Sequence, residues 1–544
     1  MSIANSVSRL WQNRKAILYY GCVSVMWILF VAIVLQKGAL IFLNGTPQEI
    51  REMNTVVFAD YFAHGKNLYA VSNLESAIPA PTSMYGFLVP LILAFFVRLF
   101  SFTGLSSLQI CELITLAVEI TGALFFYRLF YRKTSQRLTA VVGMVFFYYC
   151  YWRYDGFGGA FPDQWGITLS IILLYLVDRD TDRNAYRPGL YAAFIIGLFY
   201  IKQYFVFAVI GLCVYLFIRS KKEFTKLILY GIGEGFFSVL LVYCVFPLYF
   251  SEALPIGQGQ TNTSDMAHSI GQIRVLNEVY KGAIVFGCVY FFMLLYQKIN
   301  RKKWRGGGKI LYEFCQLVCI LPLTVYIAQN GGTTYTYYLQ LWYPYVAACC
   351  TVAMGAVIDA VKARQSIRIR IVCYALCCLS VLFSLYQMLR AVPFFKCYFM
   401  TEQERAAWDR SYQILEEYAQ KGDILVPMLL SDYCLKNDME TSDYGQAQYN
   451  SPKNLENYKQ NDLWQHLFLV RYTEAVLEKN IHYNNVIIKQ ALANQEYSCI
   501  ALTSAEDYWL TQEEVTGAGY VILQTEKLIS GRTCWDVTFY VKEE

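Results

Sequence analysis

Two side chains that could act together lie in the segment VVFADYFAHGKNLYA, residues 56 to 70. Asp60 and His64 are four residues apart, so on a helix they share one face. A carboxylate can take a proton from a reacting hydroxyl, and a neighbouring imidazole can orient that carboxylate. The alternative is a helix cap or a solvated loop carboxylate. We predict that Asp60 is a catalytic base and that His64 contributes to substrate binding.

A second candidate acid, Asp163, lies in RYDGFGGAFPDQWG, residues 153 to 166, where a new apolar run begins. A carboxylate at this position could simply interact with the positive end of the helix dipole. Arg153 and Asp155, in the same stretch, could pair with each other. We predict that Asp163 is catalytic and that Arg153 and Asp155 bind substrate, provided that this segment and the Asp60 segment face one cavity.

Polar residues also interrupt two other apolar stretches. In LFYIKQYF, Lys202 and Gln203 either form a snorkelling turn or offer a cation to a phosphate group. In QNGGTTYTYYLQLWYPY, Tyr337 and Tyr338 either belong to an interfacial aromatic belt or stack on a substrate. We assign these four residues to substrate binding, together with Tyr85 from the turn that follows Asp60.

The composition shows that a membrane protein must position these residues. Of the 544 residues, 56% are hydrophobic and 17% are aromatic, and the mean hydropathy is +0.33. Such values exclude an ordinary globular protein, and apolar runs suited to about 30 Å of hydrocarbon recur along the chain. We therefore predict a polytopic α-helical membrane protein with about eleven spans. They are residues 16–36, 108–129, 138–152, 164–178, 188–201, 203–218, 226–249, 280–297, 310–328, 339–361 and 370–389.

The run from residue 86 to residue 100 is short, contains Pro90 and ends near Arg98, so its length alone does not decide whether it crosses the membrane. If it does not cross, most Lys and Arg of the loops lie on the side of the N-terminus, as the positive-inside rule requires. We predict a juxtamembrane or re-entrant helix here. The N-terminus is then cytoplasmic, and a large first outer loop, residues 37–107, faces outward.

The pattern changes near residue 398. A helical repeat, ERAAWDRSYQILEEYAQ, is followed by the short strand GDILVP, and CIALT, YVILQ and WDVTFYV alternate as strands do. We predict a small α/β domain over residues 398–544 on the outer side, after a transmembrane catalytic domain over residues 1–397.

Charge and cysteine content exclude other classes. The net charge of +5 comes mainly from loops between spans, so membrane topology explains it and no nucleic-acid partner is expected. Most of the 17 cysteines fall inside apolar runs, and no CxxC pair suggests zinc. No cofactor is indicated, and a divalent metal remains an open alternative.

The order of these motifs resembles that of the GT-C superfamily of integral-membrane glycosyltransferases. The shared features are an acid in the first outer loop, then GKNLYA and PTSMYGFLVP, a second acid in FPDQWG, and the KQ corner in YIKQYF. The resemblance covers about residues 16 to 350 and is nearest to polyprenyl-phosphate-sugar-dependent enzymes, such as bacterial protein mannosyltransferases and aminoarabinose transferases. The sequence departs from the pattern at Tyr61, where a second acid would stand, and after Tyr85, where a Pro is missing.

The resemblance implies a hexosyl- or pentosyltransferase of the bacterial plasma membrane. Its donor would be a polyprenyl-phosphate-linked sugar, and its acceptor a hydroxyl of a glycan, lipid or protein at the outer face. Two other functions stay open. A transporter or flippase would use intramembrane acids such as Glu119 and Glu234, and a glycan polymerase or ligase would act on lipid-linked oligosaccharides.

Overall fold

The structure is a computed structural model, and it describes four parts of the chain. These are residues 3–255 without 49, 77–78, 81, 84 and 155–158, residues 311–319, residues 344, 345 and 348, and residues 399–543 without 440, 442–449, 504–509 and 532.

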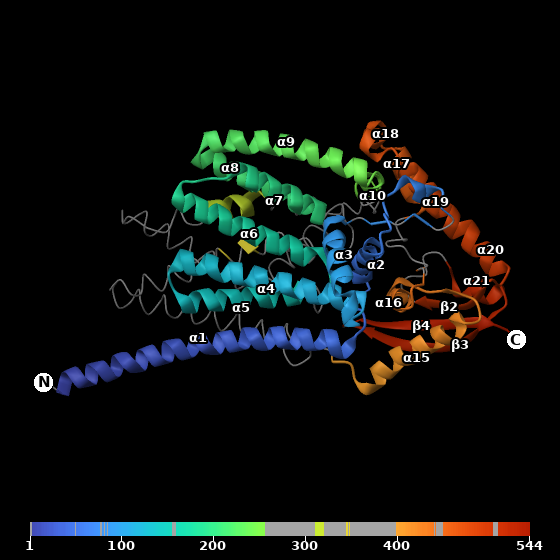
Figure 1. The fold of residues 1–544 in the computed structure, drawn as a ribbon, viewed down its shortest axis with the longest axis horizontal. Coiled ribbons are helices and arrows are strands. Elements are labelled where there is room, and N and C mark those ends of the chain that lie inside the picture. Colours follow the sequence, from blue (N-terminus) through green and yellow to red (C-terminus); the bar gives the residue numbers. More distant parts are fainter. Residues whose placement is uncertain are drawn as a thin grey trace, which may run out of the picture.

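Long helices lie side by side as a bundle (Figure 1). A buried apolar cluster, which includes Phe126, Met144, Leu174 and Leu212, fills its interior. The bundle helices are α1 (Ile3–Asn44), α4 (Ser107–Thr134), α5 (Arg137–Tyr154), α6 (Pro162–Arg183), α7 (Pro188–Ile201), α8 (Ala208–Arg219) and α9 (Lys221–Val245).

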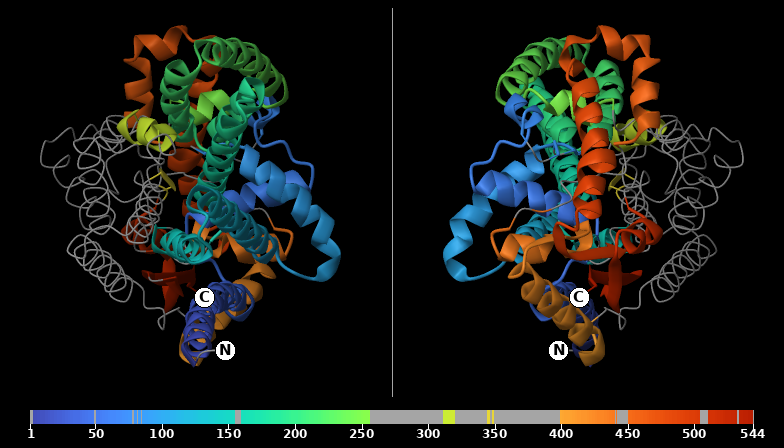
Figure 2. Two further views of the ribbon diagram at one scale, coloured as in Figure 1. Left: turned by 90° about the vertical axis from the view of Figure 1, so that its left-hand side faces the viewer. Right: turned by 90° about the vertical axis from the view of Figure 1, so that its right-hand side faces the viewer.

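These helices cover the first seven predicted spans. By length and apolar composition, three described helices can cross a membrane, at Ile17–Asn44, Ser107–Thr134 and Lys221–Val245. Large side chains along α1 and α9 are exposed, as expected where helices face lipid. Both views in Figure 2 place α1 at the edge of the molecule. The predicted spans 280–297 and 370–389 lie outside the described residues, as do most of 310–328 and 339–361, so the count of eleven stays a prediction.

The short apolar run from residue 86 to residue 100 contains α3 (Leu88–Phe100). This helix lies across the end of the bundle rather than along it (Figure 1). Pro90 falls in its first turn, where a backbone N–H has no partner within the helix, so the proline does not break it. Val89 and Leu93 are buried, while Phe95 and Leu99 are exposed. This placement agrees with the predicted juxtamembrane helix.

The connections alternate between the two ends of the bundle. One end, which we call the α2 end, carries α2 (Glu52–Ala63), α3, the turn between α5 and α6, the corner at Lys202, and α10 (Tyr249–Ala253) (Figure 1). Ion pairs hold the opposite end, where Arg132 contacts Asp178 and Asp182. The segments that contain Asp60, Asp163 and Lys202 therefore meet at one end, as predicted from their order.

The C-terminal segment also lies at the α2 end and contains a four-stranded sheet with strand order β1-β2-β4-β3. Strands β1 and β2 are parallel, whereas β4 is antiparallel to both β2 and β3. The strands are β1 (Asp423–Leu425), β2 (Tyr497–Thr503), β3 (Tyr520–Ser530) and β4 (Thr533–Lys542). They occupy the stretches that the alternating sequence pattern indicated.

Helices surround this sheet. Along β2, Cys499 and Ala501 point into one apolar cluster, while Ile500 and Leu502 point into another, as the period of two requires. The helices are α15 (Glu402–Ala419), α16 (Ser431–Lys436), α17 (Pro452–Lys459), α18 (Asp462–His466), α19 (Thr473–His482), α20 (Ile488–Ala493) and α21 (Gln512–Gly517). Short turns of other helix types lie at Val71–Leu74, Ser101–Thr103, Gln203–Phe207, Met428–Leu430, Phe468–Val470 and Tyr483–Ile487.

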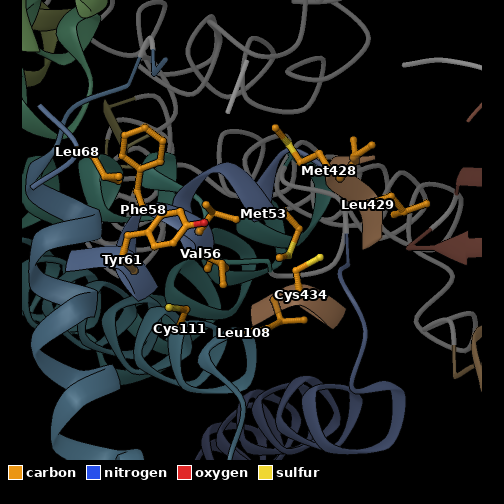
Figure 3. Close-up of a cluster of buried hydrophobic side chains, with 14 of the residues drawn as sticks. Met53, Val56, Phe58, Tyr61, Leu68, Leu108, Cys111, Met428, Leu429 and Cys434 are labelled. Atoms are coloured by element: carbon orange, nitrogen blue, oxygen red, sulfur yellow. The ribbon is translucent and has the colours of Figure 1, made fainter. Parts of the chain in front are cut away.

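The C-terminal segment shares its core with the first loop. Figure 3 shows Met53 and Val56 from α2, Leu108 from α4, and Met428 and Cys434 from the C-terminal segment in one buried cluster. The apolar contacts thus run without interruption from α2 into the sheet region. The first loop is held between the bundle and the C-terminal segment.

Candidate active site

Asp60 lies on the third turn of α2 and is buried, with 6% of its surface exposed. The Ser107 hydroxyl donates to its Oδ1 at 2.5 Å, and Nδ1 of His64 lies 3.2 Å from its Oδ2. The predicted contact between Asp60 and His64 is therefore present. The imidazole itself is more than half exposed, so it can exchange protons with water.

The surroundings of Asp60 act on its pKa in opposite directions. Burial raises the pKa, because the charged carboxylate loses water. The hydrogen bond from Ser107 and the nearby His64 oppose this rise, and the charge of Asp438 adds to it. The net result is a raised pKa, which makes the carboxylate a stronger base than an exposed aspartate.

Asp60 lines a cavity of about 750 Å³. Its walls come from α2, from the chain between Val97 and Ile110, and from residues 432–438 of the C-terminal segment. Asp163 is not among the described residues that line this cavity. We predicted that the two acids would face one cavity, and the structure instead places Asp163 against Lys202.

Asp163 and Lys202 form a buried ion pair. The Nζ of Lys202 lies 3.0 Å from Oδ1 and 2.9 Å from Oδ2 of Asp163, and the Tyr204 hydroxyl also donates to this carboxylate. The Lys202 ammonium also lies 4.3 Å from the ring centre of Tyr85. Tyr85 and Lys202, which were predicted to bind substrate, are thus neighbours, and the lysine charge is balanced by Asp163.

The local sequence explains how this pair forms. Asp163 is the second residue of α6, but the cap is made by the Gln164 side chain, which accepts from the Phe161 N–H at 3.1 Å. Asp163 lies in the first turn of α6, as the helix-dipole alternative requires, and it also pairs with Lys202. Lys202 has an extended backbone that ends α7, and Gln203 donates to the Ala253 carbonyl at 3.2 Å, which joins the corner to α10.

One buried acid, Glu52, was missed by the sequence analysis. It opens α2, has no exposed surface, and accepts hydrogen bonds from the backbone N–H groups of Gln48 and, at 2.9 Å, Ala160. A side chain at Gly159 would meet the Glu52 carboxylate, so a glycine is needed there. Glu52 thus joins the first loop to the turn just before Asp163. The available signal was a second acid at the start of the helix that carries Asp60.

Glu119, the intramembrane acid that suggested a transporter, forms an ion pair with Lys37 of α1. Both side chains are fully buried, and the Tyr148 hydroxyl lies 3.4 Å from Oε2 of Glu119. A paired acid in the bundle core has a structural explanation. Glu234 is half-buried on α9, with its carboxylate beside Gly189.

The remaining predicted site residues cannot be placed. Asp155, Tyr337 and Tyr338 lie outside the described residues, and so does the side chain of Arg153. Within the described parts of the chain, no three His, Cys, Asp or Glu side chains converge as metal ligands. Because Asp163 is bonded to Lys202, its carboxylate does not form part of such a set, and we derive no step through a metal.

The C-terminal segment fixes the turn that carries Tyr85. The buried side chain of Asn480 accepts from the Ala80 N–H at 2.8 Å and donates to the Ala80 carbonyl at 2.9 Å and to the Thr82 hydroxyl at 3.1 Å. Further along, the Gly86 N–H donates to the Ile201 carbonyl at 3.1 Å, and a side chain at Gly86 would clash with the backbone of Tyr200. The turn is thus held from α19 on one side and from the Lys202 corner on the other.

Comparison with solved structures identifies the fold. The apo oligosaccharyltransferase of Archaeoglobus fulgidus matches with a TM-score of 0.50 and 11% sequence identity, over 92% of this chain and 73% of its own. The chain has the GT-C fold. ArnT from Cupriavidus metallidurans, bound to undecaprenyl phosphate, matches with a TM-score of 0.41 and 11% identity, over 94% of this chain and 97% of its own. No family model and no curated protein matches the sequence.

The GT-C fold agrees with the arrangement described above, in which a membrane bundle carries the first loop and a C-terminal segment at one end. Two buried acids and a buried lysine from separate parts of the chain lie there, at Asp60, Asp163 and Lys202. A buried carboxylate beside a cavity can accept a proton, and a buried lysine can contact an anion.

Proposed function

We propose that this chain is a membrane glycosyltransferase that moves a hexosyl or pentosyl group from a polyprenyl-phosphate donor to an acceptor hydroxyl. The observation that carries the proposal is that the GT-C fold brings Asp60, with its cavity, and the Lys202–Asp163 pair to the same end of the bundle. Such an arrangement serves a donor whose head group lies at the membrane surface and whose chain lies in the bilayer.

The chemistry requires one base. The acceptor oxygen forms a bond to the anomeric carbon, while the bond between that carbon and the phosphate oxygen breaks and its electron pair leaves with the polyprenyl phosphate. The acceptor proton passes to the Asp60 carboxylate. Phosphate is a good leaving group, so no general acid is required, and the raised pKa of Asp60 suits it to accept the proton.

Lys202 is assigned to the donor phosphate. A compact ammonium forms charge-assisted hydrogen bonds with phosphate oxygens, and Tyr85 and Asp163 hold it in one position. Asp163 then acts through Lys202, by keeping the cation oriented before the donor arrives. Gln203, Arg153, Asp155, Tyr337 and Tyr338 remain proposed substrate contacts.

The orientation is also a proposal. At the opposite end of the bundle, Arg132 and Lys133 lie in the last turn of α4, Arg183 ends α6, and Arg187 precedes α7, so the positive-inside rule places this end in the cytoplasm. The N-terminus would then be cytoplasmic, and the α2 end with the C-terminal segment extracytoplasmic, in a bacterial plasma membrane. This is the leaflet on which a lipid-linked donor would be used.

The direct test uses the purified chain in lipid nanodiscs. We expect it to bind undecaprenyl phosphate and to consume at least one of a panel of undecaprenyl-phosphate hexoses and pentoses, releasing undecaprenyl phosphate that mass spectrometry detects. Binding without release from any donor of the panel, with membrane extract supplied as the source of acceptor, would contradict the proposed transferase activity. Absence of binding would contradict the polyprenyl-phosphate donor.

A further inference from the structure

The C-terminal wall of the Asp60 cavity contains a second buried acid that the mechanism does not use. Asp432 is 1% exposed and lines the cavity from α16. Its Oδ2 lies 2.5 Å from Nζ of Lys436 and accepts from the Tyr412 hydroxyl at 3.4 Å. Its Oδ1 has no hydrogen-bond partner within the described chain.

A buried acceptor without a donor is costly, so a ligand that fills the cavity should supply the donor. Hydroxyl, amide and ammonium groups could all do so. Lys436 and Arg98 line the same cavity and would repel a second cation. Burial raises the pKa of Asp432, and the Lys436 ammonium offsets that rise only in part. A neutral donor is therefore the better match.

The other walls also suit a ligand with several hydroxyl groups. Ser106 and Gln109 at the start of α4 line the cavity, as do Asp60 on α2 and Asp438 after α16. These polar groups come from α2, α4 and the C-terminal segment, and Val97 and Leu435 add apolar surface to the same cavity. A sugar ring presents hydroxyls around its edge and C–H groups on its faces. A peptide presents one hydroxyl on each Ser or Thr side chain.

We propose that this cavity is the acceptor site and that the acceptor is a carbohydrate, held through neighbouring hydroxyls by Asp432 and Asp60. This inference rests on the proposed glycosyltransferase function and names its acceptor class. The hydroxyl nearest Asp60 would be the one that reacts. Asp432 would select the acceptor, which gives the C-terminal segment a part in specificity.

Saturation-transfer NMR on the full chain in nanodiscs tests the inference, with maltotriose and methyl α-D-mannopyranoside as sugar probes and a neutral Ser/Thr-rich hexapeptide for comparison. We expect saturation to pass from the protein to at least one of the sugars and not to the peptide. Asp432→Asn should weaken this sugar signal at least about fivefold, because a hydrogen bond to a charged group is lost. The exposed Asp409→Asn on α15 is the matched control and should leave it unchanged.

A second variant guards against misfolding of Asp432→Asn. Ser101 is exposed and lines the cavity, so Ser101→Phe fills the space without changing a buried charge, and it should also abolish the sugar signal. Sugar binding that survives both variants, or binding of the peptide in place of the sugars, would overturn the inference. Release of undecaprenyl phosphate from a donor without sugar binding would overturn it while leaving the proposed transferase intact. Sugar binding by a chain that uses no donor would contradict the proposed transferase activity and leave the sugar-binding site standing.

Discussion

The side chain of Asn480 pairs with both backbone groups of Ala80, so that a residue of α19 holds the first loop as a neighbouring strand would. Four hundred residues of sequence separate the two partners. Tyr85, which covers the Lys202 ammonium, follows this point by five residues. The position of the C-terminal segment is thereby linked to the geometry of the proposed donor site.

Asn480→Ala should therefore loosen the first loop around Ala80 and Thr82. The change leaves two buried backbone groups without partners, at a cost of about 1–3 kcal/mol, and amide exchange there should accelerate by about 5- to 150-fold if it proceeds by local opening. Hydrogen–deuterium exchange measures this directly. The exposed Asn485→Ala in the next turn is the matched control. Equal exchange in both variants would show that other contacts hold the turn.

Lys202→Met should weaken binding of undecaprenyl phosphate by about 10- to 100-fold, the usual size of a charge-assisted hydrogen bond. The single variant leaves Asp163 buried without its cation, which itself destabilises the fold. The double variant Lys202→Met, Asp163→Asn removes both charges and keeps the volume. Wild-type affinity in the folded double variant would leave Lys202 only a structural role.

Ser107→Ala should shift the acid side of the pH–rate profile to higher pH. The Ser107 hydroxyl stabilises the ionised form of Asp60, so its loss raises the pKa of Asp60 further. The base works only when ionised, and a higher pKa means that less of it is ionised at a given low pH. Activity well above this pKa should change little. An unshifted profile would mean that another group limits the rate at acid pH.

The orientation can be tested with cysteine substitutions at exposed positions of the two ends. In whole cells, a chain with its other exposed cysteines changed to serine should react with an impermeant thiol reagent at Lys66→Cys and not at Ala185→Cys. Lys66 follows α2, and Ala185 lies between α6 and α7 at the opposite end. Reaction at residue 185 alone would invert the proposed orientation.

The sequence predicted helices better than it predicted contacts. Hydropathy and the polar pair Lys202–Gln203 gave both bounds of α7, because a lysine with an extended backbone ends an apolar helix at the membrane surface. The charge bias between loops predicted that α3 is not a span, and α3 lies across the end of the bundle (Figure 1). These are local properties, or sums over many loops, and they can be read without knowing which helices are neighbours.

Pairing between distant residues could not be read in this way. Glu119 with Lys37, Glu52 with Ala160, and Asp163 with Lys202 each depend on which helices pack together. The apolar residues of α16 and the sheet looked like the core of a separate unit, yet many of them belong to one buried cluster with α2, which α16 contacts directly. An apolar pattern shows that one face of an element is buried, but it does not show which other element covers that face.

The central claim is that Asp60 takes the acceptor proton at a site supported by Asp163. The most direct measurement is the turnover of Asp60→Asn with a donor that the wild type uses. Asparagine keeps the shape of the side chain but removes its basicity, so we expect a loss of at least about a hundredfold, with undecaprenyl phosphate binding unchanged. Near wild-type turnover in Asp60→Asn would contradict the account, whatever the activity of Asp163→Asn, because loss of the partner of Lys202 is itself expected to lower turnover.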